Sequence, residues 1–332
     1  MWNKNFKRMK ITKLIAFIIG SVIFLTSCQR DLDEVVTNPV NPGNIDYWYN
    51  NIPDTASSTL LRDELRPELE LDSFQITPGT VTVFGNPIGL QVTVAGGDLV
   101  SGISQSYQGI VSLRSKLVKK KGDMIRWGLS SSSNNELLVS GMLFYTSFEG
   151  TGGPLTIAPN KSIIGSSPDT PVLQSMKTYH GQTFINGNNS WLPGVDTSLN
   201  FVQSANNYYR VFTNNQGWNM AGMVYNNATT PSTNLSLALP ANFTNANTIA
   251  YISFNDMRSV LPLTGNAITR KFTASAVPGN LPITVTVMSK IGNNYYLAQS
   301  LVTTDAQNNT QTITLTPAPS SLQEINSFLD TL

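Results

Sequence analysis

The sequence predicts an all-β protein of two tandem antiparallel β-sandwich domains, the second immunoglobulin-like or transthyretin-like, with a short C-terminal helix. Runs of β-branched or alternating residues recur from residue 74 onward, and each is bounded by Gly, Asn or Pro. Only 12% of the residues are charged, while Asn, Thr, Ser and Gly are abundant, as on the surface of a secreted β-protein. A length of 332 residues favours two domains over one.

The first sandwich is expected over residues 74–175. Its predicted strands cover residues 80–84, 88–94, 109–118, 137–148, 155–158 and 162–164. Lys119, Lys120 and Lys121 form the one basic cluster of this part, and we interpret them as a polar turn between strands. A short helix is expected over 58–65, ending before Pro67.

Residues 176–206 are rich in turn residues and are predicted to form a connector, or an insertion that contributes to a binding face. The second sandwich is expected over residues 207–332, with strands at 208–213, 234–239, 248–254, 268–276, 283–289, 295–303 and 310–316. Ser321 and Glu324 have the spacing of a capping box and predict a terminal helix that packs on the second sandwich.

The N-terminus has the pattern of a secretory signal peptide. Residues 14–25 are free of charge, which is too short a stretch to span a membrane. Five basic residues and no acidic one precede this stretch: Lys4, Lys7, Arg8, Lys10 and Lys13. We therefore predict a signal peptide over residues 1–27.

The apolar stretch ends in Leu25, Thr26, Ser27 and Cys28, which resembles the lipobox of bacterial lipoproteins. That resemblance implies cleavage before Cys28 and lipidation of its thiol, with residues 28–73 as the lipidated cysteine and a flexible tether. Two or three acyl chains anchor a protein durably, whereas one does not. The competing interpretations are a cleaved signal peptide with an incidental cysteine and an uncleaved anchor.

The residues after the cysteine bear on location. They are Gln29, Arg30, Asp31, Leu32, Asp33 and Glu34. Gln29 stands where an aspartate would retain a Gram-negative lipoprotein in the inner membrane. The acidic cluster resembles the surface-export signal of Bacteroidota lipoproteins, although a solvated charge run in a tether looks the same. We expect a lipid-anchored outer-membrane protein exposed at the cell surface.

The charge composition of the chain limits the kinds of molecule that this protein can bind. Without residues 1–27, the chain keeps 16 of its 21 basic residues and all 20 acidic ones, a net charge of −4. No basic face is expected, so nucleic acid is excluded as a partner. The expected partners are the membrane, through the lipidated N-terminus, and a glycan or another envelope protein.

Several short sequence segments resemble those of an uncharacterised family of Bacteroidota lipoproteins with two β-domains, over roughly residues 74–332. These segments lie at 121–125, 136–142, 208–212, 217–219, 247–254 and 295–297. Many members continue past the Gly-Trp-Asn of 217–219 with an aspartate and an aromatic residue, whereas this chain has Met220 and Ala221. The resemblance implies the two-domain architecture and the envelope location, and it implies no activity.

Catalytic and metal sites are not expected, and no cofactor is predicted. His180 is the single histidine and Cys28 the single cysteine, which excludes histidine-cluster metal sites and Cys/His nucleophilic catalysis. No nucleophile elbow accompanies His180. A carboxylate pair for glycoside hydrolysis stays open, with candidates Asp123, Glu136, Glu149, Asp169 and Asp196.

Aromatic residues are the remaining candidates for binding. Trp191 lies in the turn-rich segment beside Asn188 and Asn189, and sugar-binding sandwiches combine a flat aromatic ring with amide groups in this way. We therefore name these three as candidate ligand contacts. The predicted function is non-enzymatic binding or envelope assembly; the alternative is an extracellular polysaccharide hydrolase that uses an unrecognised carboxylate pair.

Overall fold

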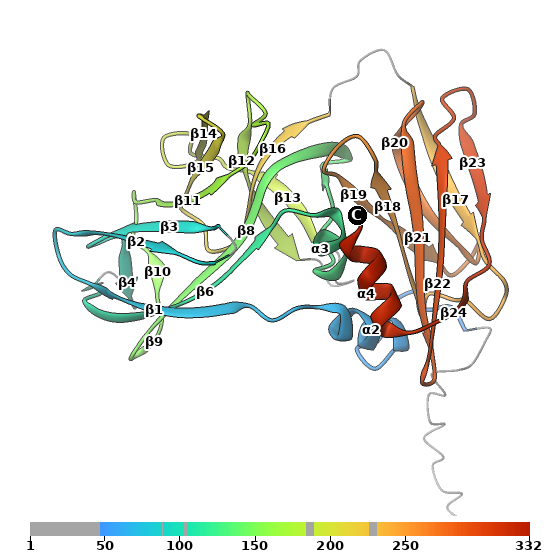
Figure 1. The fold of residues 1–332 in the computed structure, drawn as a ribbon, viewed down its shortest axis with the longest axis horizontal. Coiled ribbons are helices and arrows are strands. Elements are labelled where there is room, and N and C mark those ends of the chain that lie inside the picture. Colours follow the sequence, from blue (N-terminus) through green and yellow to red (C-terminus); the bar gives the residue numbers. More distant parts are fainter. Residues whose placement is uncertain (1–46, 88, 103–104, 184–188, 226–230) are drawn as a thin grey trace, which may run out of the picture. The chain divides into compact units, whose positions relative to one another are not determined.

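The computed structural model describes residues 47–87, 89–102, 105–183, 189–225 and 231–332 (Figure 1). Strands account for 54% of the described residues and helices for 9%, so the predicted all-β class with a short C-terminal helix is confirmed. Within these residues, no helix is both long and apolar enough to cross a membrane. The predicted signal peptide, the lipobox, Cys28 and the acidic segment that follows lie outside the described residues.

The first group of strands forms two main sheets and one small sheet. One main sheet has the order β1-β6-β8-β16-β12-β13, and β7 and β9 pair with β8. Its strands are β1 (Glu70–Ile76), β6 (Gly109–Val118), β7 (Ser132–Ser133), β8 (Glu136–Gly150), β9 (Gly153–Pro154), β12 (Lys177–Thr183), β13 (Asn189–Pro193) and β16 (Gly217–Val224).

The other main sheet has the order β14-β15-β11-β3-β2, and the small one the order β10-β4-β5. These strands are β2 (Val81–Gly85), β3 (Gln91–Ala95), β4 (Leu99–Ser101), β5 (Gln105–Ser106), β10 (Thr156–Ile157), β11 (Ile163–Pro168), β14 (Phe201–Ala205) and β15 (Tyr208–Thr213). All the pairs in these three sheets are antiparallel.

The two main sheets enclose a hydrophobic core. Val111, Leu113 and Phe144 of one sheet contact Val92 and Val211 of the other in one buried cluster. Alternate residues of each strand reach this core because successive side chains of a strand point to opposite faces. Gly165 of β11 allows a close approach between the sheets, since a Cβ there would lie 2.4 Å from Cζ of Phe144.

The second group of strands has the order β23-β17-β20-β19-β18-β21-β22-β24. The strands are β17 (Ser232–Ala238), β18 (Thr248–Phe254), β19 (Val260–Asn266), β20 (Lys271–Pro278), β21 (Pro282–Ile291), β22 (Asn294–Thr303), β23 (Thr310–Thr314) and β24 (Ala318–Ser320). β19 pairs with β18 through residues 260–263 and with β20 through residues 264–266. This change of partner lets the strands fold around a core that includes Leu237, Ile252, Phe272 and Val285.

Three helices complete the described chain: α2 (Ser57–Leu65), α3 (Lys121–Arg126) and α4 (Leu322–Asp330). α2 ends before Pro67, as predicted. α4 begins at the predicted capping box, in which Ser321 accepts from the Glu324 N–H and the Glu324 carboxylate accepts from the Ser321 N–H. These hydrogen bonds lower the pKa of Glu324.

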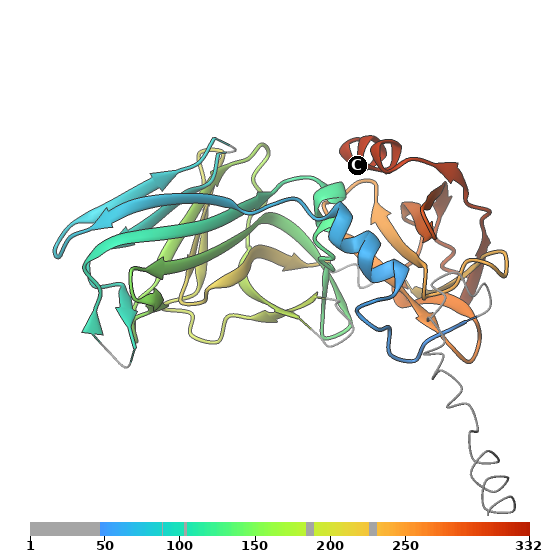
Figure 2. The same ribbon diagram turned by 90° about the horizontal axis from the view of Figure 1, so that it is seen from below.

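The helices share one buried cluster with strands of both groups. Leu61 of α2, Ile125 of α3 and Leu329 of α4 pack with Tyr179 of β12 and Tyr251 of β18. Figure 2 shows α2, in blue, beside α3. The sequence predicts that α4 packs on the second sandwich, and α4 also contacts α3, where Arg126 donates to the main-chain oxygen of Asn326 and the carboxylate of Asp330 (both 2.7 Å).

The strand pairing corrects the predicted connector. Residues 176–206 contain β12, β13 and β14, and β15 and β16 pair with strands of the first group. The second group therefore begins at β17, about 25 residues later than the predicted boundary at 207. Asn and Gly turns led to the error because they mark tight reversals between paired strands as well as linkers.

Candidate functional site

Trp191, the leading predicted ligand contact, belongs to the core. It lies in β13 opposite Gly181, is 0% exposed, and packs among the residues shared by the helices and both groups of strands. Its Nε1–H donates to the main-chain oxygen of Ser130. The prediction of a ligand contact at Trp191 is wrong, because its ring packs in the hydrophobic core and is closed to a ligand. Asn188 and the side chain of Asn189 lie outside the described residues.

His180 belongs to a hydrogen-bonded group that we call the His180 network, with Asn200, Thr213 and Asn219. Its Nε2 lies 3.1 Å from Oδ1 of Asn200 and 3.2 Å from Oγ1 of Thr213. The Thr213 hydroxyl donates to Oδ1 of Asn219 at 2.7 Å. Since an amide oxygen only accepts, Nε2 carries the proton. Burial lowers the pKa of His180, and the hydrogen bond to Asn200 opposes that shift.

The five carboxylates proposed as hydrolase candidates are dispersed. Asp123 pairs with Arg126, Glu149 lies 4.0 Å from Arg114, and Asp196 accepts from the Ser198 N–H and hydroxyl. Glu136 is exposed at the start of β8. Of the five, Asp169 lines the cavity described next.

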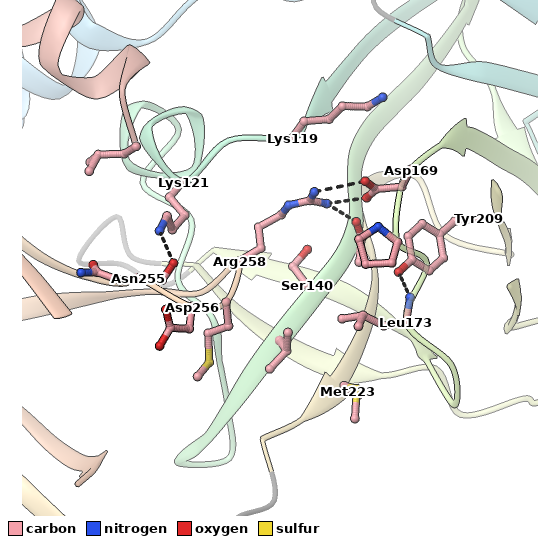
Figure 3. Close-up of a pocket in the computed structure, with 15 residues that line it drawn as sticks. Lys119, Lys121, Ser140, Asp169, Leu173, Tyr209, Met223, Asn255, Asp256 and Arg258 are labelled. Atoms are coloured by element: carbon pink, nitrogen blue, oxygen red, sulfur yellow. Dashed lines mark hydrogen bonds and ion pairs between the residues drawn. The ribbon is translucent and has the colours of Figure 1, made fainter. Parts of the chain in front are cut away.

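A cavity of about 540 Å³ lies where β8 meets the segment that connects β18 to β19 (Figure 3). This volume is within the range of small-molecule sites. We call it the Ser140 cavity. Its wall is in part apolar, from Val139, Pro171, Leu173, Met223, Met257 and Leu332, and in part polar, from Lys119, Lys121, Ser140, Asp169, Asn255, Asp256 and Arg258.

Ser140 supplies an unbonded hydroxyl to this cavity. The residue is 2% exposed, and its Oγ has no hydrogen-bond partner among the described residues. Trp127, Thr146, Tyr251 and Thr286 also carry buried polar atoms without a partner, but none of these four lines the cavity. An unbonded buried hydroxyl costs free energy, so Ser140 is a candidate to bond a group outside the described residues, such as a ligand.

A β-bulge positions this part of β8. Met142 pairs with Ala221 and Ser140 with Gly222, so Gly141 has no residue opposite it. Position 141 requires glycine, because a Cβ there would lie 2.7 Å from Cζ of Tyr209. The bulge interrupts the ladder and leaves the Gly141 carbonyl available to a side chain.

Arg258 uses that carbonyl. Its Nη1 donates to Gly141 O and, at 2.8 Å, to Oδ2 of Asp169, while Nη2 lies 3.4 Å from Oδ1. The main-chain oxygen of Arg258 accepts from the Ser140 N–H at 3.1 Å. Both ends of Arg258 are therefore fixed to β8, and the guanidinium beside Ser140 is held in one orientation.

The ammonium groups of Lys119 and Lys121 in the cavity wall are bonded to main-chain oxygens and, within the described chain, not to carboxylates. Lys119 donates to Pro168 O at 3.0 Å, and Lys121 donates to Phe254 O at 2.7 Å. Across the described ranges, neither ammonium group forms an ion pair with a carboxylate. Burial lowers the pKa of Lys121, and the charge of Asp256 opposes that shift.

This arrangement can hold a small molecule through one hydroxyl, one oriented guanidinium and an apolar wall. Both oxygens of Asp169 face Arg258, so that carboxylate is engaged in an ion pair. Among the residues that the structure covers, no group of three or more His, Cys, Asp or Glu side chains could hold a metal ion.

The sequence gives little sign of this site. Ser140 and Arg258 are 118 positions apart. Ser140 lies in the family-like segment 136–142, where nothing marks it as a binding residue, and Arg258 lies in none of these segments. The Lys119–Lys121 cluster was visible, but it was interpreted as a turn, whereas α3 begins at Lys121. The glycine next to Ser140 in a strand pattern was the one usable signal, because an isolated strand glycine often marks a bulge. No protein-family model and no curated protein sequence matches this chain.

Proposed function

We propose that this protein is a lipid-anchored component of the bacterial outer membrane, exposed at the cell surface, whose folded part binds a ligand without transforming it. Lipidation at Cys28 and the acidic residues after it are the basis for the location. The observation that carries the binding role is the buried, unbonded hydroxyl of Ser140 in a cavity of about 540 Å³.

The surroundings of Ser140 support binding over catalysis. Arg258 and Asp169 hold each other in a paired geometry, so neither group is presented as a nucleophile or a general base. The apolar wall and the oriented polar groups are the features with which binding sites fix a ligand.

The anchor is tested by growing cells with a palmitate analogue and comparing the wild type with Cys28→Ala. We expect labelling and membrane attachment in the wild type and neither in the variant, because the thiol is the acceptor of the lipid. Protease treatment of intact cells should remove the wild-type protein. Labelling of Cys28→Ala, or full protection from protease, would contradict the proposed anchor or the surface exposure, respectively.

The binding role is tested by affinity capture with the full-length protein, from envelope extract and on a glycan array. A partner retained by the wild type and lost from Ser140→Ala supports binding at the Ser140 cavity. The control is Ser101→Ala, which removes an exposed hydroxyl from β4. No captured partner, or equal capture by all three proteins, would contradict the role assigned to the cavity.

A hydrolase remains the second candidate because two carboxylates, Asp169 and Asp256, line the same cavity. Asp256 is exposed and has no ion pair among the described residues. Turnover of a polysaccharide by the wild type that is abolished in Asp256→Asn would replace the binding role with this one.

A further inference from the structure

The Ser140 cavity has the chemistry to recognise a particular class of small molecule. We propose that it binds an organic carboxylate attached to a compact apolar group, either a free branched carboxylic acid or the C-terminal residue of an apolar peptide. This inference rests on the proposed binding role and specifies the ligand of the same site.

The first argument is the hydrogen-bond donor that Ser140 places in the cavity wall. The Ser140 hydroxyl is without a partner and is 2% exposed. It lies in the chain next to the bulge at Gly141, and its own N–H is bonded to Arg258. The main chain of Ser140 is therefore held against that of Arg258, and the Ser140 hydroxyl and the Arg258 guanidinium can both donate to the oxygens of one ligand group.

The second argument is charge. The cavity is lined by three cationic side chains, Lys119, Lys121 and Arg258, and by two anionic ones, Asp169 and Asp256. Arg258 and Asp169 neutralise each other, which leaves two side-chain ammonium groups against one side-chain carboxylate. A negatively charged ligand group gains attraction here, and it offsets the cost of burying the Lys121 ammonium group.

The third argument is the apolar wall. Met223 and Met257 face the cavity with Leu173 and Val139. Methionine side chains adapt to the shape of an aliphatic group, and burial of that group provides affinity that a bare inorganic anion would lack. A carboxylate with a branched aliphatic tail can therefore contact the polar part of the wall with its charged group and the apolar part with its tail.

The test is isothermal titration calorimetry on the full-length protein in mild detergent. The probes are 4-methylpentanoate, its uncharged amide 4-methylpentanamide, and N-acetyl-alanyl-leucine. We expect one of the two acids to bind, and the amide to bind roughly tenfold more weakly, because it lacks the charge that the cations recognise. The acid that binds more tightly identifies the free acid or the peptide end as the source.

Two variants locate the binding. Ser140→Ala removes only the unbonded oxygen and is expected to weaken acid binding by roughly tenfold. Lys121→Met is expected to weaken acid binding and to leave amide binding unchanged. The control Ser101→Ala should match the wild type. Circular dichroism of each variant checks the fold, and Ser140→Ala loses no hydrogen bond, so it is expected to fold normally.

The inference is overturned if neither acid binds, if acid and amide bind equally, or if Ser140→Ala binds the acid as the wild type does. Capture of an envelope partner that depends on Ser140 would then still support the proposed binding role, so failure of the ligand class is distinguishable from failure of the function.

Discussion

The His180 network and the Ser140 cavity differ in how their polar atoms are bonded. The network lies within the first group of strands, and the cavity lies where β8 meets the segment that connects β18 to β19. In the His180 network, the Thr213 hydroxyl donates to Asn219 and accepts from the Asn215 N–H at 3.1 Å. The Asn219 amide donates in turn to the main-chain oxygens of Asn215 and Gly217. In the Ser140 cavity, the central hydroxyl has no partner.

This difference separates structural polar groups from groups that are available to a ligand. A satisfied network stabilises one arrangement of the chain, and removing a member leaves its partners unbonded. An unsatisfied hydroxyl that lines a cavity forms no bond that stabilises the fold, and its burial costs free energy. The hydrogen bonds of His180 and Trp191 identify both as structural residues, whereas the unbonded hydroxyl of Ser140 is the basis on which we propose binding at the cavity.

The largest effect is expected from Trp191→Ala, which tests whether the region around His180 is structural. The ring is 0% exposed, so its removal should lower the free energy of unfolding by about 3–5 kcal/mol. Leu192→Ala in the same strand is the control, because Leu192 is 40% exposed and its loss should change stability by less than about 1 kcal/mol. Urea unfolding followed by fluorescence or circular dichroism measures both. Equal effects of the two substitutions would contradict the core position of Trp191.

A smaller effect on stability is expected from the loss of a hydroxyl, and it should depend on whether that hydroxyl is hydrogen-bonded (Thr213) or unbonded (Ser140). Thr213→Val leaves Asn219 Oδ1 and the Asn215 N–H each one partner short, and should cost about 1–3 kcal/mol of stability. Ser140→Ala loses no hydrogen bond and removes a buried hydroxyl that has no partner among the described residues, so its stability should equal that of the wild type or exceed it by about 1–3 kcal/mol. Chemical denaturation of the two variants side by side provides the measurement. A Ser140→Ala loss as large as that of Thr213→Val would mean that Ser140 has a structural partner.

The smallest effect concerns pH. Burial lowers the pKa of His180 in the folded protein, so the unfolded chain takes up the proton first as the pH falls. The stability that neutral His180 contributes is complete above its unfolded pKa of about 6.5 and is lost as the pH falls toward the lowered folded value. The wild type should therefore lose more stability than His180→Gln between about pH 7 and pH 5. Thermal unfolding at both values measures this, and a parallel loss in the two proteins would refute it.

Local sequence patterns were sufficient where structure depends on neighbours in the chain. Residues 109–118 were predicted as a strand and form β6 over the same residues. The capping box of Ser321 and Glu324 was predicted and is formed. Strand alternation and helix capping act within a few residues, so the sequence displays them directly.

Pairing between distant strands was not predictable in the same way. The segment from 177 to 224 was assigned to a connector and a second domain, but β12 and β16 pair with the sheet that contains β8. A strand pattern shows which face is apolar and does not show which partner covers it. The same limit explains Trp191, whose burial depends on residues of α2, α3 and β18.

Local composition and spacing in the sequence predict the all-β class, many strand positions, the extent of α2, the start of α4 and the pattern at Cys28 that supports the proposed location. They do not predict α3, which forms where a turn is expected. The tertiary structure alone decided which polar residues are bonded. Ser140 is one serine among many in the sequence; its significance arises because the Gly141 bulge and Arg258, from a strand connection more than a hundred residues away, enclose a hydroxyl that no residue of the described chain satisfies.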